Sequence, residues 1–153
     1  MAGSSDVTVE SALTSTGPSA LAEPYLERIA KPWGEELILT RGAHSVVKML
    51  RIRPHCRLSL QYHRHKHESL MLLDGGALLS LGANTRRLRR EPLVAGVRRD
   101  IRAGMLHRLS AGASGADILE VASRLPGDAE DIVRLADDYG RAPSAESRAL
   151  STD

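Results

Sequence analysis

The feature that most constrains this chain is the stretch over residues 54–75, where four histidines, a glutamine and a glutamate lie between apolar residues. In its first half, apolar and polar side chains alternate from residue 58 to residue 63. This period of two predicts a β-strand, whose successive side chains point to opposite faces. Gln61, His63 and His65 therefore fall on one face of the predicted strand.

The second half of this stretch predicts another strand. Glu68 precedes the apolar run of residues 70–73, which ends at the glycine pair of residues 75 and 76. Such a pair after an apolar run is typical of a turn. Two strands arranged in this way can direct Gln61, His63 and Glu68 at one point.

Short apolar segments with the same character occur over residues 35–40, 45–53, 77–82, 101–112 and 116–123. Glycine and proline turns separate them, and no helical pattern intervenes. This spacing predicts an all-β fold, an antiparallel sandwich or barrel. The segment over residues 83–102 is predicted to be a loop; it contains seven arginines, Arg86, Arg87, Arg89, Arg90, Arg98, Arg99 and Arg102.

The pattern changes only near the end of the chain. Asp128 can cap a helix, Ile132 and Leu135 follow at helical spacing, and Gly140 can end it. We therefore predict one short C-terminal helix on the β fold. Residues 1–22 and 142–153 are rich in small and polar residues and are predicted to be disordered tails, which leaves one ordered domain over residues 23–141.

Composition narrows the class of protein. The formal net charge is only +2, too small to favour nucleic acid or a membrane as a partner. The single cysteine, Cys56, rules out an intrachain disulfide. The chain has no apolar run of the ~20 residues that a membrane helix needs, and its first residues lack the order of a signal peptide. We expect a cytoplasmic protein.

A divalent metal site in an enzyme needs three or four nitrogen or oxygen donors and an open position. Gln61, His63, Glu68 and the distant His107 supply such a set. A single histidine in a polar strand end is more often a surface residue, but this combination at inward-facing spacing favours a metal site. His65 and His67 are interpreted as lying outside the ligand set.

The order of these residues resembles the paired motifs of the cupins. Gln61 stands in the place of the first motif's first histidine, and His63, Glu68 and a glycine at residue 75 follow at similar spacing. Residues 102–107 resemble the second motif, with arginine in its proline place and His107 in its histidine place. The resemblance implies a jelly-roll β-barrel.

Glutamine at the first histidine place is similar to the phosphomannose isomerases. Several stretches resemble the type II phosphomannose isomerase cupin domain: KPWG at 31–34, LSLQYHRHK at 58–66, ILEV at 118–121, EDIVR at 130–134 and DYGR at 138–141. The likeness runs from about residue 31 to residue 141. It implies a stand-alone, metal-dependent isomerase that interconverts mannose 6-phosphate and fructose 6-phosphate, acting on a small-molecule sugar phosphate.

The resemblance also implies roles for single residues. Gln61, His63, Glu68 and His107 would hold a divalent metal, for which zinc is the expected ion and iron, manganese and cobalt are alternatives. The candidate catalytic residues are Lys48, His65 and Lys66, and the base is left open between His65, metal-bound water and Lys48. The candidate substrate-binding residues are Lys48, Lys66, Arg134 and Arg141. The cupin resemblance further implies a homodimer.

Some positions depart from the family pattern. His55 replaces a glycine, Lys66 replaces an arginine, and Ser69 and Leu70 replace a histidine and a tryptophan. The change from arginine to lysine loses a planar, bidentate grip on phosphate. Two alternatives therefore stay open: a non-catalytic cupin that binds a sugar or a metal as a sensor or accessory subunit, and another cupin enzyme such as an iron-dependent oxygenase.

Overall fold

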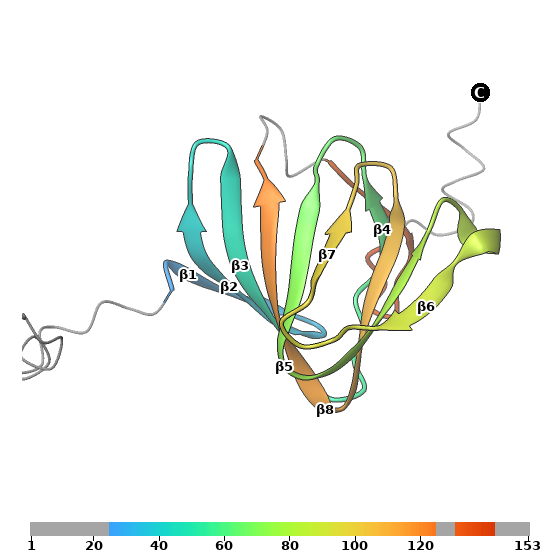
Figure 1. Cartoon of the computed structure of the whole chain (residues 1–153), viewed down its shortest axis with the longest axis horizontal. Coiled ribbons are helices and arrows are strands. Elements are labelled where there is room, and N and C mark those ends of the chain that lie inside the picture. The colour runs from blue at the N-terminus through green and yellow to red at the C-terminus, as the bar shows by residue number, and fades with distance from the viewer. Residues whose placement is uncertain (1–24, 125–130, 143–153) are drawn as a thin grey trace, which may run out of the picture.

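The computed structural model describes residues 25–124 and 131–142 (Figure 1). These residues form nine strands and one short 3₁₀ helix, η2 (Thr85–Arg87). The strands are β1 (Glu27–Lys31), β2 (Gly34–Arg41), β3 (Ser45–Ile52), β4 (Leu60–His63), β5 (Glu68–Gly82), β6 (Arg89–Pro92), β7 (Arg98–Ile101), β8 (Leu106–Ser123) and β9 (Ile132–Ala136). Apart from residue 142, the predicted tails over residues 1–22 and 142–153 lie outside the described part of the chain. No helix among the described residues is long and apolar enough to cross a membrane.

The strands form one antiparallel sheet in which β8 is central. The order along the sheet is β1-β2-β3-β8-β4-β9, and β5 pairs with β6, β7 and β8. Figure 1 shows this sheet curling so that β3, β8, β5 and β4 surround a common interior. The prediction of an all-β antiparallel barrel is confirmed. Because β4 pairs with β8 and β9, its side chains meet those of β5 across this interior and not as sheet neighbours.

The glycine pair at residues 75 and 76 is not a turn, as the sequence had predicted. It lies within the 15-residue strand β5, where the register with β8 shifts on both sides of Gly75. Gly75 has φ +80°, and a Cβ there would lie 2.3 Å from the carbonyl oxygen of Gly115. Gly115, with φ +75°, precedes Ala116, the residue paired with Gly75 on β8, an 18-residue strand that spans most of residues 101–123. The glycines therefore bend two long, paired strands together.

The predicted C-terminal helix is wrong over its described part. Residues 132–136 form strand β9, which pairs with β4 from Leu60 to His63. The acidic residue expected in the first helical turn, Asp131, instead accepts hydrogen bonds from the backbone N–H groups of His65 and Lys66. Pairing with the exposed edge of β4 thus overrides a weak helical pattern in which β-branched residues already favoured a strand.

The prediction of a loop over residues 83–102 is also wrong. The segment contains η2 and the strands β6 and β7, which pair with opposite ends of β5. Arg98 and Arg99 form ion pairs with Asp100 and Glu91. These are short strands at the edge of the sheet, where charged side chains are tolerated because one side of the strand faces water; the arginines obscured the strand pattern.

The interior changes from apolar to polar along the strands. On β3, Leu50 and Ile52 are buried in the core, and on β5 so are Leu70 and Leu72. Two residues further along each strand, on the same inward face, lies a charged residue. These residues are Lys48 beside Leu50 on β3, Glu68 beside Leu70 on β5, and Glu120 beside Ile118 on β8. The apolar half of the barrel supports a polar pocket at its other end.

Candidate functional site

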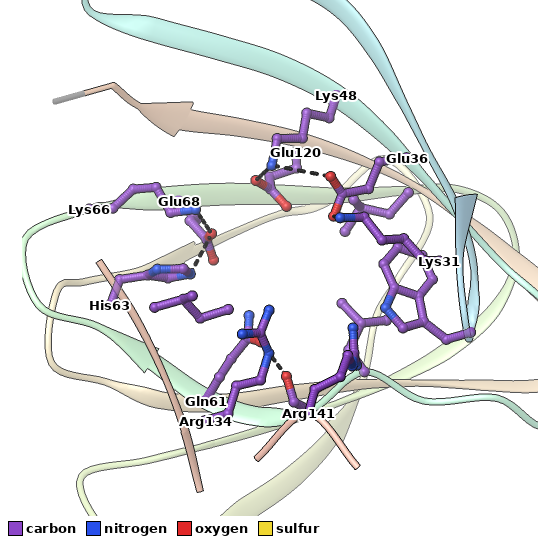
Figure 2. Close-up of a pocket in the computed structure, with 15 residues that line it drawn as sticks. Lys31, Glu36, Lys48, Gln61, His63, Lys66, Glu68, Glu120, Arg134 and Arg141 are labelled. Carbon is purple, nitrogen blue, oxygen red and sulfur yellow. Dashed lines mark hydrogen bonds and ion pairs between the residues drawn. The ribbon is translucent and has the colours of Figure 1, made fainter. Parts of the chain in front are cut away.

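The polar end of the barrel contains a pocket lined from seven strands and from the segments beside them (Figure 2). We call it the polar pocket. Its lining residues are Lys31, Trp33, Glu36, Lys48, Leu50, Leu58, Ser59, Gln61, His63, Lys66, Glu68, Glu120, Ile132, Arg134 and Arg141.

Three of the predicted metal ligands meet beside this pocket: His63 and Glu68 line it, and His107 contacts Glu68. His63 on β4, Glu68 on β5 and His107 on β8 are each 5% exposed or less, and one donor atom from each lies within 4.8 Å of the others. The Nε2 atom of His63 is 3.0 Å from Oε1 of Glu68, and the Nε2 atom of His107 is 3.3 Å from Oε2 of Glu68. The structure brings these three residues together from separate strands.

The rings of the two histidines are oriented by groups behind them. Nδ1 of His107 donates to the backbone carbonyl oxygen of Met105 at 3.0 Å, which leaves the lone pair of Nε2 directed at the cluster. Nδ1 of His63 faces Oδ2 of Asp131 at 3.4 Å. Histidines that bind metals commonly direct their second ring nitrogen at a carbonyl or carboxylate in this way.

Gln61 also lies beside the cluster, but the amide nitrogen of its side chain, and not the amide oxygen, faces His107. Nε2 of Gln61 is 3.4 Å from Nε2 of His107, and its Oε1 accepts a hydrogen bond from the hydroxyl of Ser59 at 2.5 Å. A metal ligand must be the amide oxygen. A half-turn of the amide would place this oxygen at the cluster, so that Gln61 could be the fourth ligand only in the turned orientation.

The buried charges of the cluster stabilise one another. Burial acts to raise the pKa of Glu68, but contacts with His107 and His63 outweigh it and hold this pKa well below its usual range. Burial acts to lower the pKa of His107, but the interactions with Glu68 outweigh it and raise that pKa. The carboxylate of Glu68 is thus ionised in a site that is nearly closed to water.

The donor set fits a divalent metal ion. Both ring nitrogens of His63 are buried and face carboxylate oxygens, but neither contact has the geometry of a hydrogen bond, and buried polar atoms that lack hydrogen bonds are costly. Two imidazole nitrogens and a carboxylate are the ligands of many catalytic metal sites, which keep a further position open. The opening toward the polar pocket provides such a position.

A second group of charged residues lines another part of the polar pocket. Lys31, Glu36, Lys48 and Glu120 follow one another with alternating charge, at distances of 3.5, 3.7 and 3.5 Å between successive charged atoms. Burial acts to lower the pKa of Lys48, but the charges of Glu120 and Glu36 outweigh it and raise that pKa. Burial raises the pKa of Glu120, and the charge of Glu68 acts in the same direction.

Two arginines close the pocket on the side of β9 (Figure 2). Arg141 forms an ion pair with Asp137 at 2.6 Å, and its guanidinium lies 5.4 Å from the ring centre of Tyr139. Nε of Arg134 is buried without a hydrogen bond. Burial lowers the pKa of Arg134, and the charge of Arg141 lowers it further. Two neighbouring cations with an unused donor form a favourable place for an anion.

Of the other predicted site residues, all but His65 line the polar pocket. Lys48, Lys66, Arg134 and Arg141 all line the polar pocket, and Nζ of Lys66 is 3.0 Å from Oε1 of Glu68. His65 is exposed and does not line the pocket.

Sequence reasoning assigned no role in the site to Glu36, Glu120 or Asp131. Glu120 carried a signal, since it is an acidic residue at an inward position of an apolar strand. Asp131 was assigned to the predicted helix, so its position behind His63 depended on pairing that the local pattern did not show.

Comparison with known families and proteins gives consistent results. Residues 22–137 match the family model described as mannose-6-phosphate isomerase C-terminal. The chain is 30% identical over 115 residues to the xanthan biosynthesis protein XanB of Xanthomonas campestris, covering 74% of this chain and 24% of that protein. It is 32% identical over 114 residues to the alginate biosynthesis protein AlgA of Pseudomonas aeruginosa, covering 74% of this chain and 23% of that protein. The chain thus spans about a quarter of the length of these curated relatives.

Solved structures show the same fold at low identity. A cupin-superfamily sugar phosphate isomerase from Silicibacter pomeroyi aligns with a TM-score of 0.55 and 22% identity, covering 73% of this chain and 81% of that one. Oxalate decarboxylase from Bacillus subtilis aligns with a TM-score of 0.64 and 18% identity, covering 81% of this chain and 34% of that one. The predicted cupin barrel is confirmed, apart from its helix.

Proposed function

Because the chain belongs to the family of mannose-6-phosphate isomerase C-terminal domains, we propose that it is a metal-dependent isomerase that interconverts mannose 6-phosphate and fructose 6-phosphate. The observation that carries the proposal is that one pocket is lined both by His63 and Glu68 of the buried histidine–glutamate cluster and by two arginines. An enzyme that isomerises a sugar phosphate needs a group that polarises the carbonyl of the sugar and cations that bind its phosphate.

His63, Glu68 and His107 would hold the metal ion, with Gln61 as a fourth ligand once its amide is turned. A divalent ion bound there supplies a Lewis acid that polarises a carbonyl oxygen. Zinc suits two imidazoles and a carboxylate, and it is the ion that we propose. Asp131, behind His63, and the carbonyl of Met105, behind His107, would keep the two rings directed at it.

Arg134 and Arg141 would bind the phosphate group of the substrate. Asp137 and Tyr139 hold Arg141 in place, and Nε of Arg134 is a buried donor that lacks a partner. Because an arginine presents its donors in a fixed planar fork, it suits a phosphate well. The sugar would then extend from these arginines toward Glu68 and His63, on the other side of the pocket (Figure 2).

Lys48 and Lys66 would act as cations in this pocket. Lys48 lies between Glu36 and Glu120, which keep it protonated, so it is suited to bind oxygen atoms of the sugar and not to remove a proton. Lys66 lies against Glu68 at the edge of the metal cluster, where its charge favours an oxygen atom that becomes negative during the reaction. The exposed position of His65 argues against its being the base.

The test is a coupled assay of mannose 6-phosphate and fructose 6-phosphate interconversion. Protein freed of metal is supplied separately with zinc, cobalt, manganese and iron, and the double variant Gln61→Ala/His107→Ala serves as the control. We expect turnover with zinc that the double variant loses. Folded protein that shows no turnover with any of these metals would refute the proposal. Tight sugar binding without turnover would then identify a non-catalytic cupin, and bound iron without isomerase activity would favour an oxygenase.

A further inference from the structure

Glu120 is a buried carboxylate of the polar pocket that the proposed metal and phosphate sites leave unused. It lies on β8 directly across from Lys48 on β3 and Leu70 on β5. Only 6% of the residue is exposed, and yet it lines the pocket. Its Oε1 is 3.5 Å from Nζ of Lys48 but forms no hydrogen bond. A buried carboxylate oxygen without a hydrogen bond is costly, and such groups cluster where function requires them.

The other carboxylates of the pocket are already engaged. Both oxygens of Glu68 contact basic groups, namely His63, Lys66 and His107. Each oxygen of Glu36 lies near a lysine, Oε1 near Lys31 and Oε2 near Lys48. The ion-pair partner of Glu120 is Lys48, which is not a ligand of the proposed metal and which Glu120 shares with Glu36. Among these three residues, Glu120 is therefore the one best able to accept a proton from a ligand.

The surroundings of Glu120 also suit a group that gains and loses a proton. Burial and the nearby charge of Glu68 raise its pKa, whereas Lys48 and Lys66 partly offset this effect. General bases work best when their pKa lies closer to neutral pH than that of a free carboxylate. Figure 2 shows Glu120 beside Lys48 and Glu36, on the side of the pocket away from Arg134 and Arg141. A sugar phosphate held by the arginines would therefore reach it with the end remote from the phosphate.

We propose that Glu120 is the catalytic residue that moves the proton between C2 and C1 of the bound sugar phosphate. This inference rests on the proposed isomerase function. It replaces Lys48 and His65 as candidate bases with a residue to which sequence reasoning had assigned no role.

The proton balance of this step is simple. The carboxylate of Glu120 removes the proton from C2 of the open-chain aldose, the electrons of that C–H bond form the C1=C2 double bond, and the carbonyl electrons move to O1. Glu120 then returns a proton to C1, while O2 loses its proton and forms the new carbonyl and O1 gains one. No oxidant or reductant is needed, and the carboxylate ends in its starting state.

The test compares the wild type with Glu120→Gln, which keeps the volume of the side chain but cannot take up the proton. Both proteins are loaded with the same metal, and kcat, KM and binding of fructose 6-phosphate are measured. The reaction is repeated in D₂O, and deuterium at C1 of the ketose and C2 of the aldose is followed by NMR. Asp117→Asn is the matched control, because Asp117 lies on the same strand and pairs with Arg51 outside the pocket.

We expect Glu120→Gln to lower kcat by about 10²- to 10⁴-fold, the range for loss of a general base. Binding of fructose 6-phosphate by Glu120→Gln should stay close to the wild-type value, and its deuterium incorporation should be lost. Asp117→Asn should retain the wild-type kcat and the wild-type deuterium incorporation. If Glu120→Gln does not fold, Glu120→Asp keeps the charge beside Lys48 and withdraws the carboxylate, and it should bind the ligand with reduced kcat.

Three results would overturn the inference in distinguishable ways. An active Glu120→Gln or a fully active Glu120→Asp would refute the role of Glu120 while leaving the isomerase function intact. Wild-type turnover without any deuterium in either sugar would refute proton transfer through an exchanging carboxyl group and again leave the function intact. A wild type with no isomerase activity would refute both proposals together.

Discussion

Oδ2 of Asp131 lies 3.4 Å from Nδ1 of His63, on the side of the imidazole ring away from Glu68. The same carboxylate accepts hydrogen bonds from the backbone N–H groups of His65 and Lys66. Asp131 therefore ties the start of β9 to the segment that follows β4, and it holds the His63 ring from behind.

This contact predicts that Asp131→Asn weakens metal binding. The amide keeps much of the shape of the carboxylate but removes the charge that favours the correct tautomer of His63. Loss of such a supporting carboxylate typically lowers metal affinity by about 10- to 100-fold. Competition with a chelating dye measures the effect, and Asp138→Asn, which alters an exposed pair with Arg57, serves as the control. Equal zinc affinities for the two variants would contradict the assigned role of Asp131.

The arginine pair predicts a phosphate-specific effect for Arg134→Met. A hydrogen bond to a charged group contributes about 1.5–3 kcal/mol, so binding of mannose 6-phosphate should weaken by about 10- to 100-fold. Binding of mannose, which lacks the phosphate, should not weaken. Arg124→Met, which removes an exposed arginine bonded to the carbonyl of Gly42, is the control in the same titrations. A loss that is equal for the two sugars would show that Arg134 does not bind the phosphate.

The half-buried pair of Asp137 and Arg141 predicts acid sensitivity. The hydrogen bond from Arg141 holds the pKa of Asp137 at about 2, below the usual 3.8. Because this pKa is lower in the folded state, its contribution to stability is complete above about pH 4 and is lost as the pH falls toward 2. A shift of this size corresponds to about 2 kcal/mol.

Asp137→Asn should therefore lower the free energy of unfolding by about this amount at pH 6, and the difference from the wild type should shrink between pH 4 and pH 2. Urea unfolding at a series of pH values measures it. Glu91→Gln, in a half-exposed pair with Arg99, should have a small effect at all of these pH values. A difference that does not change with pH would mean that Asp137 acts through packing alone.

The bend of β5 predicts that Gly75→Ala is strongly destabilising. The new Cβ would lie 2.3 Å from the carbonyl oxygen of Gly115, on a backbone with φ +80°. Gly96 has a similar φ of +74° but no atom within 4 Å of an added Cβ, so Gly96→Ala measures the backbone strain alone, about 1–2 kcal/mol. Gly75→Ala should cost clearly more in urea unfolding. Equal losses would show that β5 and β8 can move apart without cost.

The sequence predicted the barrel and the meeting of His63, Glu68 and His107 because both depend on local patterns. Alternation along β4 indicated the inward direction of His63, and the spacing of the two motifs supplied Glu68 and His107. The antiparallel class followed from short apolar runs and glycine turns, which remain visible whatever their partners are.

The errors arose where partners decide the structure. Ile132 to Ala136 can form either a helix or a strand by its own pattern, and only the open edge of β4 selects the strand. Gly75 and Gly76 mark a bulge or a turn equally well until their pairing with β8 and the nearby carbonyl of Gly115 are known. Glu120 and Asp131 gained their roles through neighbours on β3 and β4 that are 65 or more residues away in the chain.

The central position of β8 has a consequence for how the protein folds. Its residues 116–123 pair with residues 45–52, and its pairing with β4 joins Gln61 to His107. During synthesis, the strands before β8 can form hairpins, but the curled sheet cannot close before residues 106–123 are available. Because contacts between distant parts of a chain slow folding, we expect closure of the barrel to be the slow step, in the range of milliseconds to seconds. Until then the half-formed sheet exposes an unpaired edge at β3, where a chaperone or a second nascent chain can bind.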